Sequence, residues 1–188
     1  LNMLTPERLA DRLDNAFRLL TGGARTAVSR HQTLRETIDW SYKLLSEKER
    51  VLLRRLSVFS GGCSLEGAEA VCAGEGLKEG EVFDLLSSLV NKSIVNAEQV
   101  QGAETRYHLL ETVRQYAREK LFDAGESEAL RNRHLDYYVS FVDQAVPQIH
   151  GVGRLMWTAY LKAEHANIRE ALEWAFKDSE LPLKGLRI

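Results

Sequence analysis

The sequence is poor in the features that mark several large classes of protein. Of its 188 residues only two are cysteines, and no apolar run approaches the roughly 18 residues that cross a membrane. Cys63 and Cys72 fit neither a CxxC redox motif nor a zinc pattern, so we expect two buried thiols in a reducing cytoplasm. No signal peptide is visible. We therefore expect a cytoplasmic chain with no membrane partner.

An excess of positive charge is also missing. The net charge is −2 and the isoelectric point is about 6.3, whereas nucleic-acid-binding domains carry a strongly basic face. The motifs GxxxxGK(S/T), GxGxxG, HExxH and GxSxG do not occur. No two of the five histidines have the i, i+4 spacing of a helical metal site. We expect neither an enzyme nor a metal or cofactor site within this chain.

What the sequence does contain is a series of amphipathic helices interrupted by one short β-prone region. A polar connector is expected at residues 24–30, and two short strands at 93–98 and 105–110 flank a polar tip. The predicted helices cover residues 5–20, 31–45, 46–56, 64–72, 81–90, 111–123, 128–145 and 154–177. Three helices followed by a two-stranded hairpin predict a winged helix. The fold class is thus mainly α: a winged-helix domain followed by antiparallel helices.

Three arginines on the predicted helix 46–56 are candidates for contacts to DNA. Arg50, Arg54 and Arg55 lie largely on the side away from the apolar residues and could form a basic patch. The alternative is an ordinary solvated helix face on which Glu47 and Glu49 offset the positive charge.

The helix that precedes the hairpin would be the DNA-reading helix of a winged helix. It carries Glu79, Glu81 and Asp84 against only Lys78 and Lys92. Carboxylates repel the phosphate backbone, so this helix is a poor match for DNA.

His108 lies close to the junction between the second strand and the helix that follows it. Alternation along a strand places Tyr107 and Leu109 on the core face, and Arg106, His108 and Leu110 on the opposite face. We expect His108 to be a half-exposed strand residue, or else a pH switch or a phosphate contact.

Several stretches together resemble a known family. "RHQTLRETIDWSYKLLSEKERVLLRRLSVFSGGCSLEGAEAVC", "LLSSLVNKSIV" and "RYHLLETVRQYAREKL" resemble the winged-helix region of bacterial STAND-class ATPases, the NB-ARC-like ATPases of large transcriptional regulators. "LTPERLADRLDNAFRLLTGG" resembles the end of the helical subdomain before it. "WTAYLKAEHANIREALEWAF" resembles the start of a TPR-like region after it. The resemblance implies domains at residues 1–30, 31–124 and 125–188.

The resemblance also implies a longer parent protein, of which we expect this chain to be a fragment. The parent would carry a P-loop NTPase domain that binds ATP or ADP with Mg²⁺, and the winged helix would pack on that domain as part of a nucleotide switch. DNA would be read by another domain. The C-terminal helices would begin a superhelix that binds an inducer or a protein ligand.

In eukaryotic relatives of this family, a Met-His-Asp motif at the strand-to-helix junction contacts the β-phosphate of ADP. Alignment on "YARE" places Leu109, Leu110 and Glu111 at the three motif positions. The histidine position therefore holds Leu110. His108 precedes it by two residues, which is about 6–7 Å along a strand. The resemblance thus assigns the phosphate-sensing position to Leu110 and Glu111, with His108 as a neighbour.

Overall fold

The structure, a computed structural model, describes residues 25–99, 104–151 and 153–177. The chain divides into two compact units, residues 1–44 and 45–188. The predicted helix at 5–20 lies outside the described residues. In the first unit, helix α3 spans Arg25–Lys43, so the predicted polar connector at 24–30 is wrong. Residues 25–30 contain neither glycine nor proline, and nothing in them interrupts a helix.

The second unit begins with helix α4, Glu47–Leu56. The predicted capping box is present: the Ser46 hydroxyl accepts a hydrogen bond from the Glu49 amide, and the Glu49 carboxylate accepts one from the Ser46 amide at 2.7 Å. The apolar face of α4 is buried as expected. Its members are Val51, Leu52, Leu53 and Leu56.

Helices α5, Leu65–Cys72, and α6, Glu79–Asn91, complete a three-helix core with α4. Ser64 caps α5 by accepting a hydrogen bond from the Gly67 amide at 3.1 Å. On α6, the buried side is formed by Val82, Leu86 and Leu89, which repeat at helical spacing.

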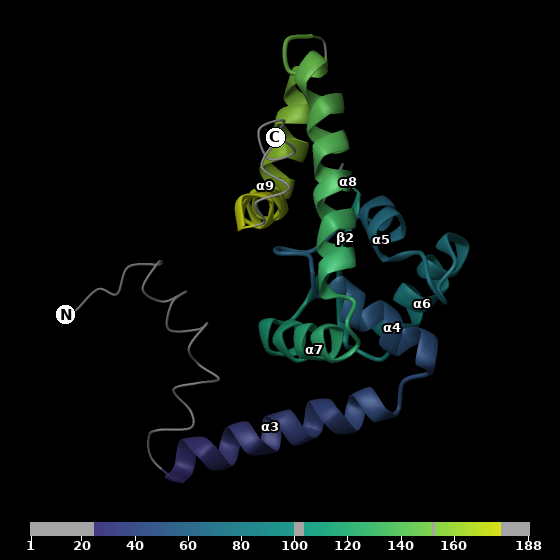
Figure 1. The fold of residues 1–188 in the computed structure, drawn as a ribbon, viewed down its shortest axis with the longest axis vertical. Helices are drawn as coiled ribbons and strands as arrows, with labels where there is room; N and C mark the ends of the chain where they lie inside the picture. Colours follow the sequence, from purple (N-terminus) through teal and green to yellow (C-terminus); the bar gives the residue numbers. More distant parts are fainter. Residues whose placement is uncertain (1–24, 100–103, 152, 178–188) are drawn as a thin grey trace, which may run out of the picture. The chain divides into compact units, whose positions relative to one another are not determined.

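A hairpin of two strands, β1 (Val95–Gln99) and β2 (Thr105–Leu109), follows α6. The strands are antiparallel, with Val95 opposite Leu109. Helix α7, Glu111–Asp123, leaves the hairpin and packs on α4 (Figure 1). These elements confirm the prediction of a mainly helical chain with a winged-helix domain.

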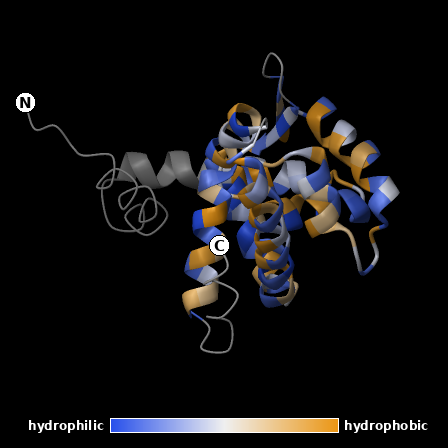
Figure 2. Cartoon of the chain, turned by 90° about the horizontal axis from the view of Figure 1, so that it is seen from above, coloured by the Kyte–Doolittle hydropathy of each residue, from blue (hydrophilic) through white to orange (hydrophobic). Residues whose placement is uncertain are grey.

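Two long helices follow: α8, Ser127–Gln148, and α9, Arg154–Lys177, which runs back beside α8 (Figure 1). Helix α8 extends past the predicted end at residue 145 and includes Pro147 in its last turn. Figure 2 shows hydrophobic and hydrophilic residues interleaved along the helices, as expected where one face is buried.

Helix α8 also packs against α5, so the winged helix and the α8–α9 hairpin belong to the same compact unit. The domain boundaries implied at residues 30 and 124, and the continuation of α9 into a TPR-like superhelix, stay predictions.

Candidate functional site

The exposed face of α6 is acidic and partly aromatic. Glu79 and Asp84 are exposed, and half of the Phe83 side chain reaches solvent. Glu81 accepts hydrogen bonds from Lys48 at 2.6 Å and from the Lys78 amide at 3.1 Å, so the nearest lysine is already paired. This face would repel a phosphate backbone.

The hairpin adds no positive charge to this surface. Glu98 and Glu104 are exposed. Arg106, the only basic residue of Lys or Arg type in β1 and β2, is ion-paired with Glu164 of α9 and donates to the Gly62 carbonyl oxygen at 3.1 Å. The positive charge of Arg106 is therefore engaged in contacts within the chain.

The arginines of α4 do not form the outward-facing patch that was considered from the sequence. Arg55 is 1% exposed and donates to the Glu126 carboxylate at 2.8 Å and to the carbonyl oxygens of Cys72 and Glu75. Arg54 donates to the same carboxylate at 2.6 Å. The sequence placed Arg55 on the outer side of the helix, and this prediction is wrong. Glu126, the residue before α8, pairs with Arg55, which is buried. Arg50 remains partly exposed.

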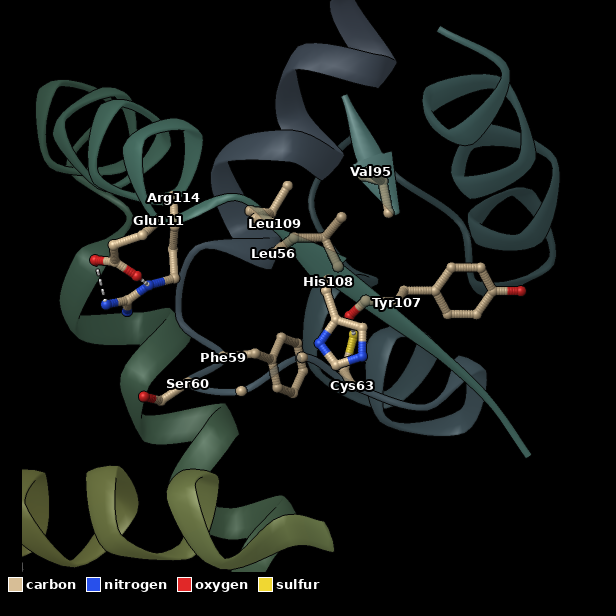
Figure 3. Close-up of a pocket in the computed structure, with 12 residues that line it drawn as sticks. Leu56, Phe59, Ser60, Cys63, Val95, Tyr107, His108, Leu109, Glu111 and Arg114 are labelled. Atoms are coloured by element: carbon tan, nitrogen blue, oxygen red, sulfur yellow. Dashed lines mark hydrogen bonds and ion pairs between the residues drawn. The ribbon is translucent and has the colours of Figure 1, made fainter. Parts of the chain in front are cut away.

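A pocket of about 200 Å³ lies where β2 meets α7 (Figure 3). Its walls come from the end of α4, the turn that follows, the hairpin and the first turn of α7. The residues that line it are Leu56, Phe59, Ser60, Gly61, Gly62, Cys63, Val95, Tyr107, His108, Leu109, Glu111 and Arg114. The pocket joins an apolar floor to a few polar groups, which is the usual composition of a small binding site.

Glu111 and Arg114 form the charged side of the pocket. The Arg114 guanidinium donates to both carboxylate oxygens of Glu111, at 2.8 and 2.9 Å (Figure 3). Burial raises the pKa of Glu111, but the hydrogen bonds from Arg114 and Gln115 outweigh it and hold the pKa below its usual range. Glu111 also sits in the first turn of α7, where the helix dipole favours a negative charge.

His108 lies against the tight turn at Gly62. A Cβ added to Gly62 would lie 2.4 Å from the ring Nδ1, and the φ of +84° there suits only glycine. The other ring nitrogen, Nε2, is 3.6 Å from the Glu98 carboxylate, which becomes an ion pair if the ring is protonated. The histidine therefore helps to close the pocket on the side of the hairpin.

The structure brings together two of the three residues that the sequence placed at this junction. His108 and Glu111 line the pocket, whereas Leu110 does not, and its side chain is 57% exposed. Leu110 is the residue before α7 and has an extended backbone. Sequence reasoning missed Arg114. Its spacing of three residues from Glu111 on a helix was the available signal.

No group of three or more His, Cys, Asp or Glu side chains that could hold a metal ion occurs among the described residues. Within the same residues, no helix is both long and apolar enough to cross a membrane.

The arrangement of α4, α5, α6, the hairpin and α7 defines a class of domain, and residues 45–122 match the family described as "Winged helix-turn-helix domain". The chain is also similar to "Putative HTH-type transcriptional regulator Rv0890c" of Mycobacterium tuberculosis and "Putative HTH-type transcriptional regulator Mb0914c" of Mycobacterium bovis. Each is 46% identical over 179 residues, which cover 95% of this chain and 20% of the relative.

A second kind of relative, "Uncharacterized protein Rv0894" of Mycobacterium tuberculosis, is 44% identical over 132 residues. The match covers 70% of this chain and 33% of that protein. No solved structure matches the chain. The chain thus spans about one fifth of the length of the regulators that it resembles.

Proposed function

We propose that this chain is a non-catalytic regulatory module of a transcriptional regulator, and that its winged helix contacts protein rather than DNA. The role in transcription is supported by the names of the two regulators to which nearly the whole chain is similar. The preference for protein is supported by the distribution of charge on the domain.

One observation carries this preference: the surfaces that a winged helix would present to DNA are acidic. Residues 45–110 contain ten carboxylate residues and seven Lys or Arg residues. Five of those seven cations are paired with carboxylates at 2.8 Å or closer: Lys48, Arg54, Arg55, Lys92 and Arg106. A DNA-binding face needs several free cations at the phosphates, because their charge supplies most of the non-specific affinity.

A titration of the full chain with mixed-sequence duplex DNA tests the proposal. At about 50 mM salt we expect no binding in the micromolar range. The double variant Glu79→Lys/Asp84→Lys makes the exposed face of α6 basic and should create weak binding that disappears at about 200 mM salt. The control Glu128→Lys/Glu173→Lys has the same net charge but changes α8 and α9, and should not bind. Salt-dependent micromolar binding by the unaltered chain would overturn the proposal.

The family resemblance supports a finer proposal: the winged helix packs on an NTPase domain of the longer protein and takes part in an ADP/ATP switch with Mg²⁺. The pocket at the β2–α7 junction could admit one phosphate group but not a nucleotide. Arg114 is the side chain that would bind a phosphate oxygen. To do so, its guanidinium would have to release the Glu111 carboxylate, to which it donates two hydrogen bonds. Leu110 and His108 would lie at the edge of that contact.

This finer proposal concerns the full-length protein, so its test belongs there. Arg114→Gln should speed the release of ADP by about tenfold, which corresponds to the loss of one charged hydrogen bond. Arg118→Gln is the matched control, because Arg118 is on the same helix and pairs with Glu170 of α9 instead. Equal rates of ADP release for the two variants would show that the pocket takes no part in the switch.

Direct DNA binding is the second candidate function. It is favoured by the match to a winged helix-turn-helix family and by the "HTH-type" in the relatives' names. Arg50 is the arginine of α4 that could take part, since Arg54 and Arg55 are bound to Glu126. The DNA titration above separates the two candidates.

A further inference from the structure

The turn that forms one wall of the pocket is held by a side chain from a distant helix. Asn167 of α9 accepts a hydrogen bond from the Ser60 amide at 2.7 Å and donates one to the Gly62 carbonyl oxygen at 2.9 Å. Asn167 has no exposed surface. Its amide therefore acts as a clamp across the turn, satisfying one donor and one acceptor of the backbone.

Glu164, one helical turn before Asn167, joins the second wall of the pocket to the same clamp. One oxygen of its buried carboxylate accepts hydrogen bonds from the Tyr138 hydroxyl and the Asn167 side-chain amide, both at 2.7 Å. The other oxygen is paired with Arg106 of β2, which also donates to the Gly62 carbonyl oxygen. Helix α8, helix α9, strand β2 and the turn thus meet in one buried polar network.

A buried network of this kind is stable only when all of its members are paired. Removing one partner leaves the others buried without hydrogen bonds, at a cost of about 1–3 kcal/mol for each neutral group and more for a charge. Partial loosening is therefore unfavourable, and we expect the contact between α9 and the turn to form or break as a unit.

We propose that Glu164 and Asn167 are positioning residues through which the docking of α9 controls the pocket at the β2–α7 junction. When α9 is docked, the turn at residues 60–62 and strand β2 are held in place, and the pocket has its volume of about 200 Å³. When α9 undocks, both walls are released. The coupling is reciprocal, so that a ligand that prefers the open pocket also favours undocking of α9. The inference does not depend on what the winged helix binds.

The two cysteines provide a direct test in the full chain. Cys63 lines the pocket, whereas Cys72 is fully buried in α5 outside it. Burial raises the pKa of both thiols, so each reacts with a thiol reagent only after an opening that exposes it. Labelling with excess dithiobis-nitrobenzoate, read for each cysteine by peptide mass spectrometry, measures pocket opening at Cys63 and global unfolding at Cys72.

For Asn167→Ala and for Glu164→Gln we expect the labelling rate of Cys63 to rise about tenfold or more while that of Cys72 changes less than about twofold. Trp174→Phe is the control, because it removes the 2.9 Å bond from Trp174 to Asn132 between α9 and α8 without touching the turn. It should leave the Cys63 rate unchanged.

Three results would overturn the inference. An equal rise at both cysteines would mean that the variants only destabilise the whole unit. An unchanged rate at Cys63 would mean that the clamp does not control the pocket. A rise at Cys63 in Trp174→Phe as large as in Asn167→Ala would assign the effect to general packing of α9 on α8.

Discussion

Arg50 and Arg55 belong to the same helix, but their surroundings are opposite. The Arg55 guanidinium is enclosed and bridges Glu126, the residue before α8, to two backbone carbonyl oxygens near the end of α5. Arg50 is 31% exposed and lies 3.7 Å from Glu47. A charge of the same sign thus links α5 to the start of α8 in one case, and in the other lies at a partly exposed position beside a neighbouring carboxylate.

Arg55→Ala should destabilise the fold by about 2–4 kcal/mol, because it leaves two carbonyl oxygens without their donor and removes one of the two arginines that pair with Glu126. Arg50→Ala should change the free energy of unfolding by no more than about 1 kcal/mol, because its partner Glu47 is 76% exposed and ion pairs at the surface contribute little. Urea unfolding followed by circular dichroism compares them. Similar losses for both variants would contradict the internal role of Arg55.

Glu49 links stability to pH. Burial raises the pKa of this carboxyl, but hydrogen bonds from Lys92, Ser88 and Ser46 outweigh it and lower the pKa to about 2 from an ordinary value of 4.5. A group whose pKa is lowered by folding stabilises the fold above its unfolded pKa and loses that contribution as the pH falls through the folded one.

The advantage of the unaltered chain over Glu49→Gln should therefore be full at pH 6. It should shrink by about 1–3 kcal/mol between pH 5 and pH 2. Urea midpoints at a series of pH values measure it. A difference that is independent of pH would show that the Glu49 charge does not contribute.

Among the elements, the turn between α4 and α5 is tightly packed at Gly62. Gly62 has a φ of +84°, and a Cβ there would lie 2.4 Å from the His108 ring and 2.7 Å from the Tyr107 carbonyl oxygen. Gly76 has a similar φ of +78°, but nothing lies within 4 Å of the corresponding position. Alanine at Gly76 would therefore meet backbone strain alone, whereas alanine at Gly62 would meet the same strain and a steric clash.

Gly76→Ala should cost about 1–2 kcal/mol, the strain of a left-handed residue. Gly62→Ala should cost at least about 2 kcal/mol more, because His108 and strand β2 must also move. Thermal unfolding of both variants provides the comparison. Equal costs would mean that the hairpin can shift away from the turn without penalty.

The elements that could be predicted from the sequence are those whose signals are local. The capping box at Ser46, the apolar positions of α6 and the β-prone residues around Tyr107 all lie within a few residues of what they determine. The candidate site could not be predicted as well. Glu126 reaches Arg55 across 71 residues, and Asn167 reaches Ser60 across 107, and helical periodicity has no information about such partners.

At the scale of the molecule, residues 45–188 form one compact unit in which the hairpin of α8 and α9 completes the winged helix. Its contacts with the winged helix are polar as well as apolar. Glu164 of α9 is ion-paired with Arg106 of β2, and the His134 ring of α8 packs against Phe59, where burial lowers the pKa of His134 to about 3. The domain and the hairpin should therefore unfold together.

A Trp40→Phe variant tests this, because both remaining tryptophans, Trp157 and Trp174, lie in α9. Their fluorescence reports the unfolding of α9, and thiol labelling of Cys72 reports the unfolding of α5. The two probes should give the same urea midpoint, as expected for a single cooperative unit. A lower midpoint for fluorescence would show that the hairpin unfolds separately.

The clamp between Asn167 and Ser60 also has a consequence for the order in which the chain folds. The two residues are 107 positions apart, so the contact closes one of the longest loops in the unit. Contacts of high sequence separation form late, and synthesis proceeds at about 5–20 residues per second. The core of α4, α5 and α6 can therefore assemble several seconds before α9 has been made. During synthesis, this wall of the pocket should therefore acquire its final shape only after α9 has been made.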